Sequence, residues 1–435
     1  MARRISILTV GTLGDVAPMV VLGRALADQG YAVSVAAPDN FRHLIEGMGL
    51  EARRCGSDFS TLMKDEEVGS LTGARTLKQL LAWRFPGPKV RAMFEGVLRD
   101  AVAASADADA IIFHPYISIA SDIAEARRIP AILVPLGLIS PSAETPLAVL
   151  PRPTSPTWNR ISYSLIYLQR HAYQSTIYDI RRQSLGLGRG FRYKHPHKVR
   201  GQRVTAIYPV SPVLTPYANG VDADVHFTGY WFRDDEPRWQ PSPRLAEFLS
   251  GTPRPIYIGF GSMPYIGRER TEMLLAACEA AGQRAVLGKG WGAFCDSGEA
   301  SLSENFRVLG YAPHLSLFRD VSAVVHHGGL GTTSAGLMAG RPTLVCPFLV
   351  DQPYWGHRVA QLGAGPEPLP IAEWTFERLT AAIRDLASNP LYRTRAAEIG
   401  AEMRDEGGQV AAARIIRSII GAPELAPHEA LLGTD

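Results

Sequence analysis

The sequence predicts an α/β protein with two parallel-sheet domains, and three observations indicate this fold class. Short apolar segments rich in β-branched residues alternate with helical patterns in both halves of the chain, as they do in parallel sheets. A tract of prolines, glycine and charged residues separates the two series, which is typical of an interdomain linker. The length of 435 residues also exceeds one hydrophobic core, because domains hold ~150 residues each.

The first series begins with a short apolar strand at residues 5–10. A Gly-rich turn and a helical pattern follow, and Gly30 ends the helix. The next elements are predicted as strand, helix, strand, helix and strand, at residues 31–36, 41–48, 110–113, 123–128 and 131–135.

The middle of the chain departs from this alternation. Residues 151–156 are rich in proline, and residues 158–203 are basic and aromatic, with helical spacing and no strand pattern. We interpret this part as an insertion that builds part of a cleft. A strand at residues 204–210 precedes the predicted linker at residues 234–255.

The second series repeats the alternation of strands and helices. Its strands are predicted at residues 256–260, 284–287, 307–309, 323–325 and 342–347. A last helical stretch, at residues 409–420, could pack across both halves. The predicted organisation is an N-terminal domain, a linker, a C-terminal domain and a terminal helix with its tail, at residues 1–233, 234–255, 256–408 and 409–435.

The composition is that of an ordinary globular protein, with 46% hydrophobic and 20% charged residues. The formal net charge of +3 is far below that of a nucleic-acid-binding protein, so we expect no nucleic-acid partner. No apolar stretch reaches the ~20 residues that cross a bilayer, and the apolar run after Arg4 is too short for a signal peptide. The four cysteines show neither disulfide nor zinc spacing, which favours a reducing compartment and a cytoplasmic protein.

The segment with the most candidate ligand-binding residues is the sequence VVHHGGLGTTS at residues 324–334. A strand here runs into a turn of glycines and threonines, and the helix that follows offers backbone N–H groups to phosphate. Gly329 and Gly331 permit close approach of the backbone, and Thr332 adds a hydroxyl. His327 can donate a hydrogen bond to a diphosphate oxygen. The alternative is a glycine-rich start of a helix that a threonine caps.

Two further groups of polar residues follow strand ends in the second half. Asp351 and Gln352 place a carboxylate beside an amide, and this pair can hold adjacent sugar hydroxyls. Ser262 follows the first strand of this half, so its N–H or hydroxyl could reach a phosphate. In both places a simple turn is the alternative.

In the first half, Asp15 opens the first predicted helix within the sequence GTLGDVAP. Its carboxylate could cap this helix. It could also take the proton from a hydroxyl group at the mouth of a cleft. The local sequence leaves both possibilities open.

From end to end, the chain resembles the family 1 nucleotide-sugar glycosyltransferases, which have the GT-B fold of two Rossmann-like domains facing across a cleft. Within them it resembles the sterol glucosyltransferase and antibiotic aglycone branch. The matching stretches are GTLGDVAP, SPVLTP, VHFTGYWF, IYIGFGSMP and the long segment from HHGGLGTTS to QLGAGP. The resemblance implies an inverting transfer of a hexose from a UDP-sugar, with UDP-glucose expected, to a sterol, triterpenoid or polyketide aglycone.

The resemblance also implies roles for particular residues. The diphosphate-binding positions of the family match His327, Gly329, Gly331 and Thr332. The pair that holds the donor sugar matches Asp351 and Gln352. Asp15 stands where antibiotic transferases carry a proposed base and where plant members carry their catalytic histidine. Tyr311 stands where plant members have the tryptophan that stacks on uracil.

Two departures from the family pattern bear on the details. Leu13 stands where close relatives often have arginine, which changes the electrostatics beside Asp15. Ala335 stands where plant members place a glutamate on the ribose hydroxyls, so both UDP and dTDP stay open as donor nucleotides. Because the phosphate turn can stabilise the leaving group, we expect no metal and no cofactor besides the UDP-sugar or dTDP-sugar.

Other functions stay open beside this one. A dTDP-deoxysugar transferase of antibiotic biosynthesis would use the same site. A dinucleotide oxidoreductase would need a GxGxxG turn after the first strand, which this sequence lacks. A sugar-nucleotide epimerase would need no acceptor, and a non-catalytic sugar-nucleotide-binding helper would show no turnover.

Aromatic and methionine side chains predict a lipophilic acceptor, because they supply apolar area in segments expected to line the acceptor cleft. These residues are Trp83, Phe85, Met93, Phe94, Trp158, Tyr163, Tyr167 and Tyr173. The alternative is that many of them pack the insertion. Four arginines nearby could make a weak peripheral contact with anionic lipid, although a solvated helix face is the simpler interpretation. They are Arg160, Arg170, Arg181 and Arg182.

Overall fold

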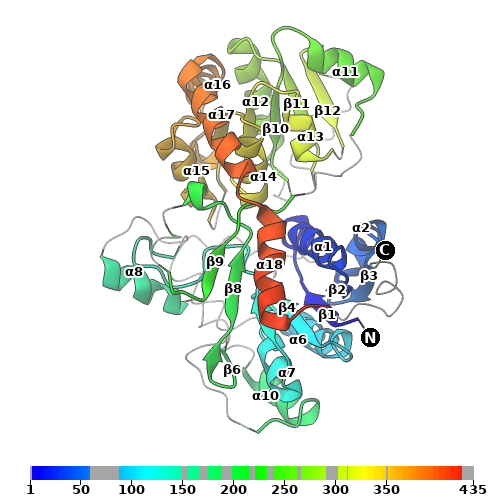
Figure 1. Ribbon diagram of the computed structural model, residues 1–435. Helices are drawn as coiled ribbons and strands as arrows, with labels where there is room; N and C mark the ends of the chain where they lie inside the picture. Colours follow the sequence, from blue (N-terminus) through cyan, green and yellow to red (C-terminus); the bar gives the residue numbers. More distant parts are fainter. Residues whose placement is uncertain are drawn as a thin grey trace, which may run out of the picture. The chain divides into compact units, whose positions relative to one another are not determined.

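The chain forms two compact units in a computed structural model (Figure 1). The structure describes residues 2–58, 88–147, 155–165, 174–188, 198–215, 217, 221–232, 239–261, 266–290, 302–310, 312–348 and 351–423. The first unit comprises Met1–Pro212, Pro216–Phe232 and Gly407–Asp435, and the second comprises Val213–Thr215 and Arg233–Glu406. The first unit is therefore discontinuous in sequence, because the chain returns to it at Gly407.

A seven-stranded sheet lies at the centre of the first unit, with the strand order β3-β2-β1-β4-β5-β8-β9. All neighbouring strands in it are parallel. The strands are β1 (Arg4–Leu8), β2 (Ala32–Ala37), β3 (Glu51–Arg54), β4 (Ala110–Phe113), β5 (Ala131–Leu133), β8 (Thr205–Tyr208) and β9 (Val225–Phe227). All four residues of β4 are buried, as expected for a central parallel strand covered on both faces.

The helices of the first unit are α1 (Leu13–Ala27), α2 (Arg42–Gly47), α6 (Pro88–Ala104), α7 (Ala120–Arg127), α8 (Pro156–Ser162), α10 (Gln174–Gln183) and α18 (Gly408–Ile420). A separate antiparallel hairpin consists of β6 (Lys198–Val199) and β7 (Gln202–Arg203). Short 3-10 turns in the chain are η1 (Asp39–Phe41), η2 (Tyr163–Leu165), η3 (Pro212–Leu214) and η6 (Ile371–Glu373).

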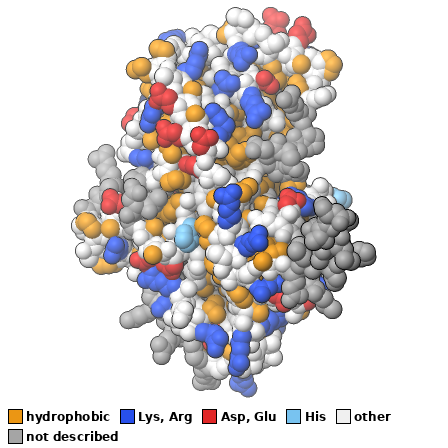
Figure 2. Space-filling model, viewed as in Figure 1, with side chains coloured by type: hydrophobic (Ala, Val, Ile, Leu, Met, Phe, Trp, Pro, Cys, Tyr) orange, Lys and Arg blue, Asp and Glu red, His pale blue; other side chains and the backbone are white. Residues whose placement is uncertain are grey.

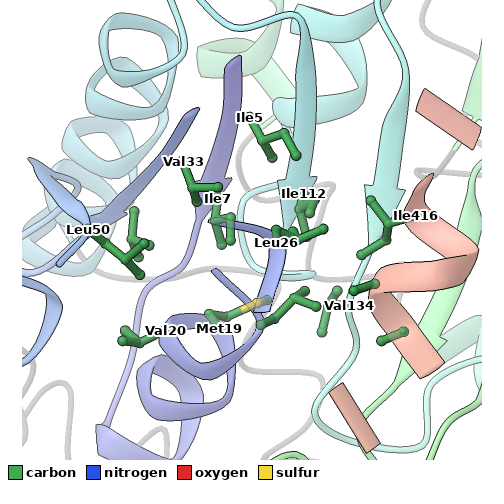
Figure 3. Close-up of a cluster of buried hydrophobic side chains, with 14 of the residues drawn as sticks. Ile5, Ile7, Met19, Val20, Leu26, Val33, Leu50, Ile112, Val134 and Ile416 are labelled. Carbon is green, nitrogen blue, oxygen red and sulfur yellow. The ribbon is translucent and has the colours of Figure 1, made fainter. Parts of the chain in front are cut away.

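The hydrophobic core of the first unit joins the two ends of the sequence. Met19 of α1, Ile112 of β4 and Ile416 of α18 belong to one buried cluster (Figure 3). The Tyr31 hydroxyl donates a hydrogen bond of 2.6 Å to the carbonyl of Gly421, just after α18. The last helix is thus an integral part of the first unit.

The second unit contains a five-stranded parallel sheet with the order β12-β11-β10-β13-β14. Its strands are β10 (Ile256–Gly259), β11 (Ala285–Gly288), β12 (Phe306–Leu309), β13 (Val324–His326) and β14 (Thr343–Val345). Its helices are α11 (Pro243–Ser250), α12 (Arg268–Ala280), α13 (His314–Phe318), α14 (Leu330–Met338), α15 (Gln352–Gln361), α16 (Phe376–Ser388) and α17 (Pro390–Arg404). The buried side chains of Ile258, Leu274 and Leu344 lie in its core.

The two parallel sheets confirm the predicted α/β class, and the differences lie at sheet edges and in the insertion. The sequence pattern does not predict β3 and β9, because β3 carries charged side chains and β9 spans three residues. The prediction of no strand within residues 158–203 is wrong, because β6 pairs with β7 there. The segment at residues 234–255, predicted as a linker, includes helix α11.

Charged side chains of both signs are spread over the face shown in Figure 2. Arg181, which the sequence places on a solvated or lipid-facing surface, is instead buried and forms an ion pair with Asp122 of α7. Across the described ranges, none of the helices has the length and apolar character needed to cross a membrane.

Candidate active-site residues

Five neighbouring strands have the same order in both sheets. In each sheet, successive strands are first added on one side of the first strand and then on its other side. This switch lies between β1 and β4 in the first unit, and between β10 and β13 in the second. Open parallel sheets bind ligands outside the carboxyl ends of their strands at such a switch. The segments that follow these four strands are therefore the places to look for a site in each unit.

Asp15 lies in the first turn of α1, shortly after the carboxyl end of β1. Its Oδ2 atom accepts hydrogen bonds from the backbone N–H and the hydroxyl of Thr12, at 2.6 and 3.0 Å. These bonds anchor the start of α1 and fix one carboxylate oxygen. Only glycine suits position 11, because Gly11 has a φ of +131° and a Cβ atom there would collide with Oδ2 of Asp15.

The other oxygen of Asp15 faces a histidine that the sequence analysis did not single out. His114 follows β4, and its Nε2 atom lies 3.6 Å from Oδ1 of Asp15. Its backbone N–H donates to the carbonyl of Leu8, which extends the β1–β4 pairing beyond the strands. The ring of Tyr116 meets the imidazole edge-on, with centroids 4.8 Å apart. The position of His114 after a predicted strand was the signal that could have identified it.

Burial shifts the pKa of both groups. It raises the pKa of Asp15 to about 6, while the hydrogen bonds from Thr12 act in the opposite direction. It lowers the pKa of His114 to about 3, so this imidazole is neutral at pH 7. The Asp15 side chain keeps 24% of its surface exposed. At pH 7 the site therefore presents an accessible carboxylate with a pKa suited to accepting a proton.

The glycine turn of the second unit follows β13 and encloses His327. Gly328 has a φ of +94°, and a Cβ atom there would lie 2.6 Å from Cγ1 of Val345. A Cβ atom on Gly329 would lie 2.6 Å from Nε2 of His327, and one on Gly261, after β10, would lie 3.1 Å from its Cε1. The glycines therefore let the His327 ring lie between two backbone segments at the switch point.

The environment of His327 keeps its imidazole neutral. Burial lowers its pKa to about 4, the charge of His314 adds to this shift, and the backbone of Gly259 opposes it. Its Nδ1 atom is buried and has no hydrogen-bond partner among the described residues. The neighbouring His326 is fully buried, and its Nδ1 accepts the N–H of Gly328 at 2.9 Å, so it holds the turn.

Helix α14 begins directly after this turn, with Gly329 as its N-cap. The first N–H groups of a helix lack partners within the helix and can hold an anion. Gly331 is exposed and Thr332 is half-buried in this first turn. The hydroxyl of Thr333 bonds back to the carbonyl of Gly329 at 3.0 Å. Because the N-cap is glycine, no threonine side chain caps α14.

Asp351 and Gln352 begin α15 beside the glycine turn. Oδ2 of Asp351 accepts a hydrogen bond from the Trp355 indole at 2.9 Å, and Oε1 of Gln352 accepts one from the N–H of Phe348 at 2.8 Å. A Cβ atom on Gly328 would lie 2.9 Å from the Gln352 carbonyl oxygen, so the two loops meet. Both side chains therefore support the start of α15, and the backbone of Gln352 meets the glycine turn at Gly328.

Several predicted residues cannot be placed or have another role. Ser262 and Tyr311 lie outside the described residues, as do the aromatic residues Trp83, Phe85, Tyr167 and Tyr173. Tyr163 has no exposed surface, and its hydroxyl donates to the carbonyl of Thr145 at 3.0 Å. The prediction that Tyr163 lines a cleft is therefore wrong, because this side chain is fully buried. Trp158 of α8, by contrast, is 54% exposed.

Two protein domain families match parts of the chain. Residues 5–135 match the glycosyltransferase family 28 N-terminal domain, a range that includes Asp15 and His114. Residues 293–416 match the C-terminal domain described as erythromycin biosynthesis protein CIII-like, a range that includes the glycine turn and α15. The matched ranges thus contain the candidate residues of both units.

Relatives of known activity align over nearly the whole chain. A sterol 3-beta-glucosyltransferase of Arabidopsis thaliana is 32% identical over 431 residues, which are 94% of this chain and 64% of that protein, so the chain spans less than two thirds of its length. A second one from the same plant is 30% identical, with 94% and 67% covered. The O-mycaminosyltylonolide 6-deoxyallosyltransferase of Streptomyces fradiae is 28% identical over 414 residues, with 93% and 94% covered.

Solved structures share the fold. The glycosyltransferase of kitacinnamycin superposes with a TM-score of 0.70 at 21% identity, covering 95% of this chain and 98% of that one. The glycosyltransferase VinC in complex with dTDP superposes with a TM-score of 0.66 at 19% identity, covering 96% and 99%. At these identities the likeness concerns the fold, and it confirms the predicted GT-B class.

Proposed function

Because the chain belongs to the family 1 nucleotide-sugar glycosyltransferases, we propose that it transfers a hexose from a UDP-sugar to a hydroxyl of a lipophilic acceptor. The expected donor is UDP-glucose, and the expected acceptor is a sterol, a triterpenoid or a polyketide aglycone. The transfer inverts the anomeric carbon and needs no divalent metal ion.

The observation that carries this proposal is the Asp15 carboxylate at the switch point of the first unit. Its pKa of about 6 leaves it ionised at pH 7 and still basic enough to accept a proton. Thr12 holds Oδ2, so Oδ1 is the oxygen that takes the proton of the acceptor hydroxyl. The acceptor oxygen then bonds to the anomeric carbon as the bond from that carbon to the diphosphate oxygen breaks. General base assistance contributes ~10²–10⁴-fold to such a step.

The leaving diphosphate carries away the electron pair of the broken bond and needs stabilisation. The N-terminus of α14 supports this role, with the residues Gly329, Gly331 and Thr332 in or before its first turn. His327 adds one N–H from its neutral ring, and Ser262 comes shortly after β10 in the sequence. These hydrogen-bond donors stabilise the leaving diphosphate in place of a divalent metal ion.

Further contacts with the sugar nucleotide are assigned from sequence position and from the family resemblance. Gln352 adjoins the glycine turn and Asp351 precedes Gln352 in the chain, which supports the role of this pair in holding the hydroxyls of the donor sugar. Tyr311 comes shortly after β12 in the sequence, and the family resemblance supports stacking of its ring on the nucleotide base.

Apolar surface beside Asp15 supports a lipophilic acceptor. Leu13 is 39% exposed and Tyr116 is 49% exposed, and these residues lie within two positions of Asp15 and His114. Exposed apolar side chains beside a carboxylate favour a large apolar alcohol over a sugar. The sterol-directed names of two relatives point in the same direction.

A second candidate function is transfer of a deoxysugar from dTDP. The Streptomyces fradiae relative is named as a deoxyallosyltransferase, and the VinC structure was solved with dTDP. The same base and phosphate-binding residues would serve this reaction, so the two candidates differ in the donor.

The proposed location is the cytoplasm, with weak contact to a membrane surface. Cys55, Cys278 and Cys346 are free thiols in the described part of the chain, as in a reducing compartment. On α8, Trp158 and Ile161 are 54% and 51% exposed beside Arg160, an arrangement that suits the headgroup region of a bilayer.

A panel of donors and acceptors tests the proposal. UDP-glucose and dTDP-glucose are each incubated with sterols, macrolides, flavonoids and simple sugars, with and without EDTA, and products are identified by mass spectrometry and NMR. We expect a β-glucoside from UDP-glucose and an apolar alcohol, at a rate that EDTA does not change. Preference for small polar sugars would contradict the lipophilic acceptor. A rate abolished by EDTA and restored by magnesium would refute the metal-free reaction, and donor binding without any product would indicate a helper protein.

A further inference from the structure

The two oxygens of the Asp15 carboxylate have different surroundings. Oδ2 accepts two hydrogen bonds from Thr12, which belongs to the same helix start. Oδ1 faces Nε2 of His114 across 3.6 Å, and His114 comes from the end of β4. One oxygen is therefore fixed from within α1, and the other has its neighbour on the adjacent strand.

The surroundings of His114 determine which of its nitrogens carries the hydrogen. The backbone N–H of Tyr116 points to Nδ1 at 3.4 Å, so Nδ1 acts as the acceptor. In a neutral imidazole the hydrogen then lies on Nε2, the atom that faces Asp15. The separation of 3.6 Å exceeds a hydrogen bond, but catalytic hydrogen bonds are often long before substrate binds.

We propose that His114 is a positioning residue for Asp15: its Nε2–H orients Oδ1 and favours the ionised carboxylate, the form that takes the proton of the acceptor. This inference rests on the proposed role of Asp15 as the base. His114 itself neither gains nor loses a proton in the reaction.

Among the residues that the structure describes, the groups around Asp15 come from three places. Thr12 lies in its own helix start, Thr9 donates its hydroxyl to the Asp15 carbonyl from the end of β1, and His114 lies on the β4 side with Tyr116 against its ring. Burial disfavours the charged form of Asp15, and hydrogen-bond donors favour it. Because Nε2–H of His114 faces Oδ1, we expect that removing this donor makes the carboxylate harder to ionise.

The test measures kcat/KM against pH for wild type, His114→Phe and His114→Gln. The wild-type rate falls below about pH 6, where Asp15 gains a proton and loses its function as base. Phenylalanine fills the space without a donor, so we expect this acidic limb to move upward by about one pH unit. The rate is then about tenfold lower at acidic pH and recovers at alkaline pH. Glutamine keeps an N–H donor, so its limb should lie near that of wild type.

His43→Phe serves as the matched control, because His43 is an exposed histidine of α2 in the same unit. Thermal unfolding of each variant checks its fold. An unchanged limb in His114→Phe, or a rate loss equal at every pH, would overturn the positioning role. Asp15→Asn is measured in parallel: if it is nearly as active as wild type, the proposed base fails, whereas an inactive Asp15→Asn with an unshifted His114→Phe limb refutes this inference alone.

Discussion

Asp15 anchors a helix, and it is also the base that we propose for the reaction. Its sequence context allows both roles, and in the structure the two carboxylate oxygens have different neighbours. Oδ2 accepts the N–H of Thr12 and anchors α1, while Oδ1 stays available beside His114. A cap fixes the carboxylate in space, and a fixed base loses less entropy when the substrate binds.

Replacement of Asp15 by asparagine tests the base directly. Asparagine keeps an oxygen for the Thr12 N–H but cannot take a proton, so turnover should fall at least ~100-fold while donor affinity stays nearly unchanged. Steady-state kinetics and calorimetry with UDP-glucose measure the two effects. Asp28→Asn is the control, because Asp28 lies at the other end of α1 in an exposed pair with Arg24. Near-normal turnover in Asp15→Asn would show that Asp15 is not the base.

His327 should affect donor binding and rate together. Its N–H meets more negative charge as the diphosphate leaves, so His327→Ala should weaken donor affinity and lower kcat further, each by about tenfold or more. Steady-state kinetics at saturating acceptor separate the change in donor affinity from the change in kcat. The exposed His357 of α15 provides the control variant His357→Ala. Wild-type kinetics in His327→Ala would place the phosphate site elsewhere.

The candidate residues that sequence reasoning proposed are those whose motif is local. His327 and the glycines stand within one short stretch after a strand, so their spacing predicts a phosphate-binding turn. His114 belongs to no such stretch. Its proximity to Asp15 depends on the pairing of β1 with β4, which brings together residues far apart in the chain.

At the scale of elements, burial decided which strands could be predicted. Central strands such as β4 and β10 are apolar on both faces, so their sequence signal is strong. The edge strand β3 reads EARR, and the backbone pairs it with β2 despite its charges. Edge strands need less burial, and their hydrogen bonds depend on a neighbour that local sequence does not reveal.

Helix α18 offers a prediction about stability. Ile416 is fully buried in the core of the first unit, so Ile416→Ala should lower its free energy of unfolding by about 2–5 kcal/mol. Ile419 on the same helix is 37% exposed, and Ile419→Ala should cost well under 1 kcal/mol. Hydrogen–deuterium exchange reports the effect by unit: β1 and β4 should lose protection in Ile416→Ala, while β10 and β13 keep theirs. Equal exchange in the two variants would contradict the core role of α18.

At the scale of the molecule, the two units repeat one arrangement. Each has a parallel sheet whose winding reverses at a central pair of strands, and Asp15, His114 and His327 follow those strands. The alternation of strands and helices predicted both sheets. Composition and spacing could not predict that His114 faces Asp15, because this contact follows from packing between segments distant in sequence.

The return of the chain to the first unit has a consequence for synthesis on the ribosome. The core of that unit includes Ala412, Ile416 and Ile420, which are translated after every strand of the second unit. The second unit can bury its own sheet as it emerges from the ribosome. The sheet of the first unit keeps an apolar strip exposed until α18 has been synthesised. A nascent chain arrested before Gly408 would expose this strip to chaperones, although all seven strands of the central sheet of the first unit had already been made.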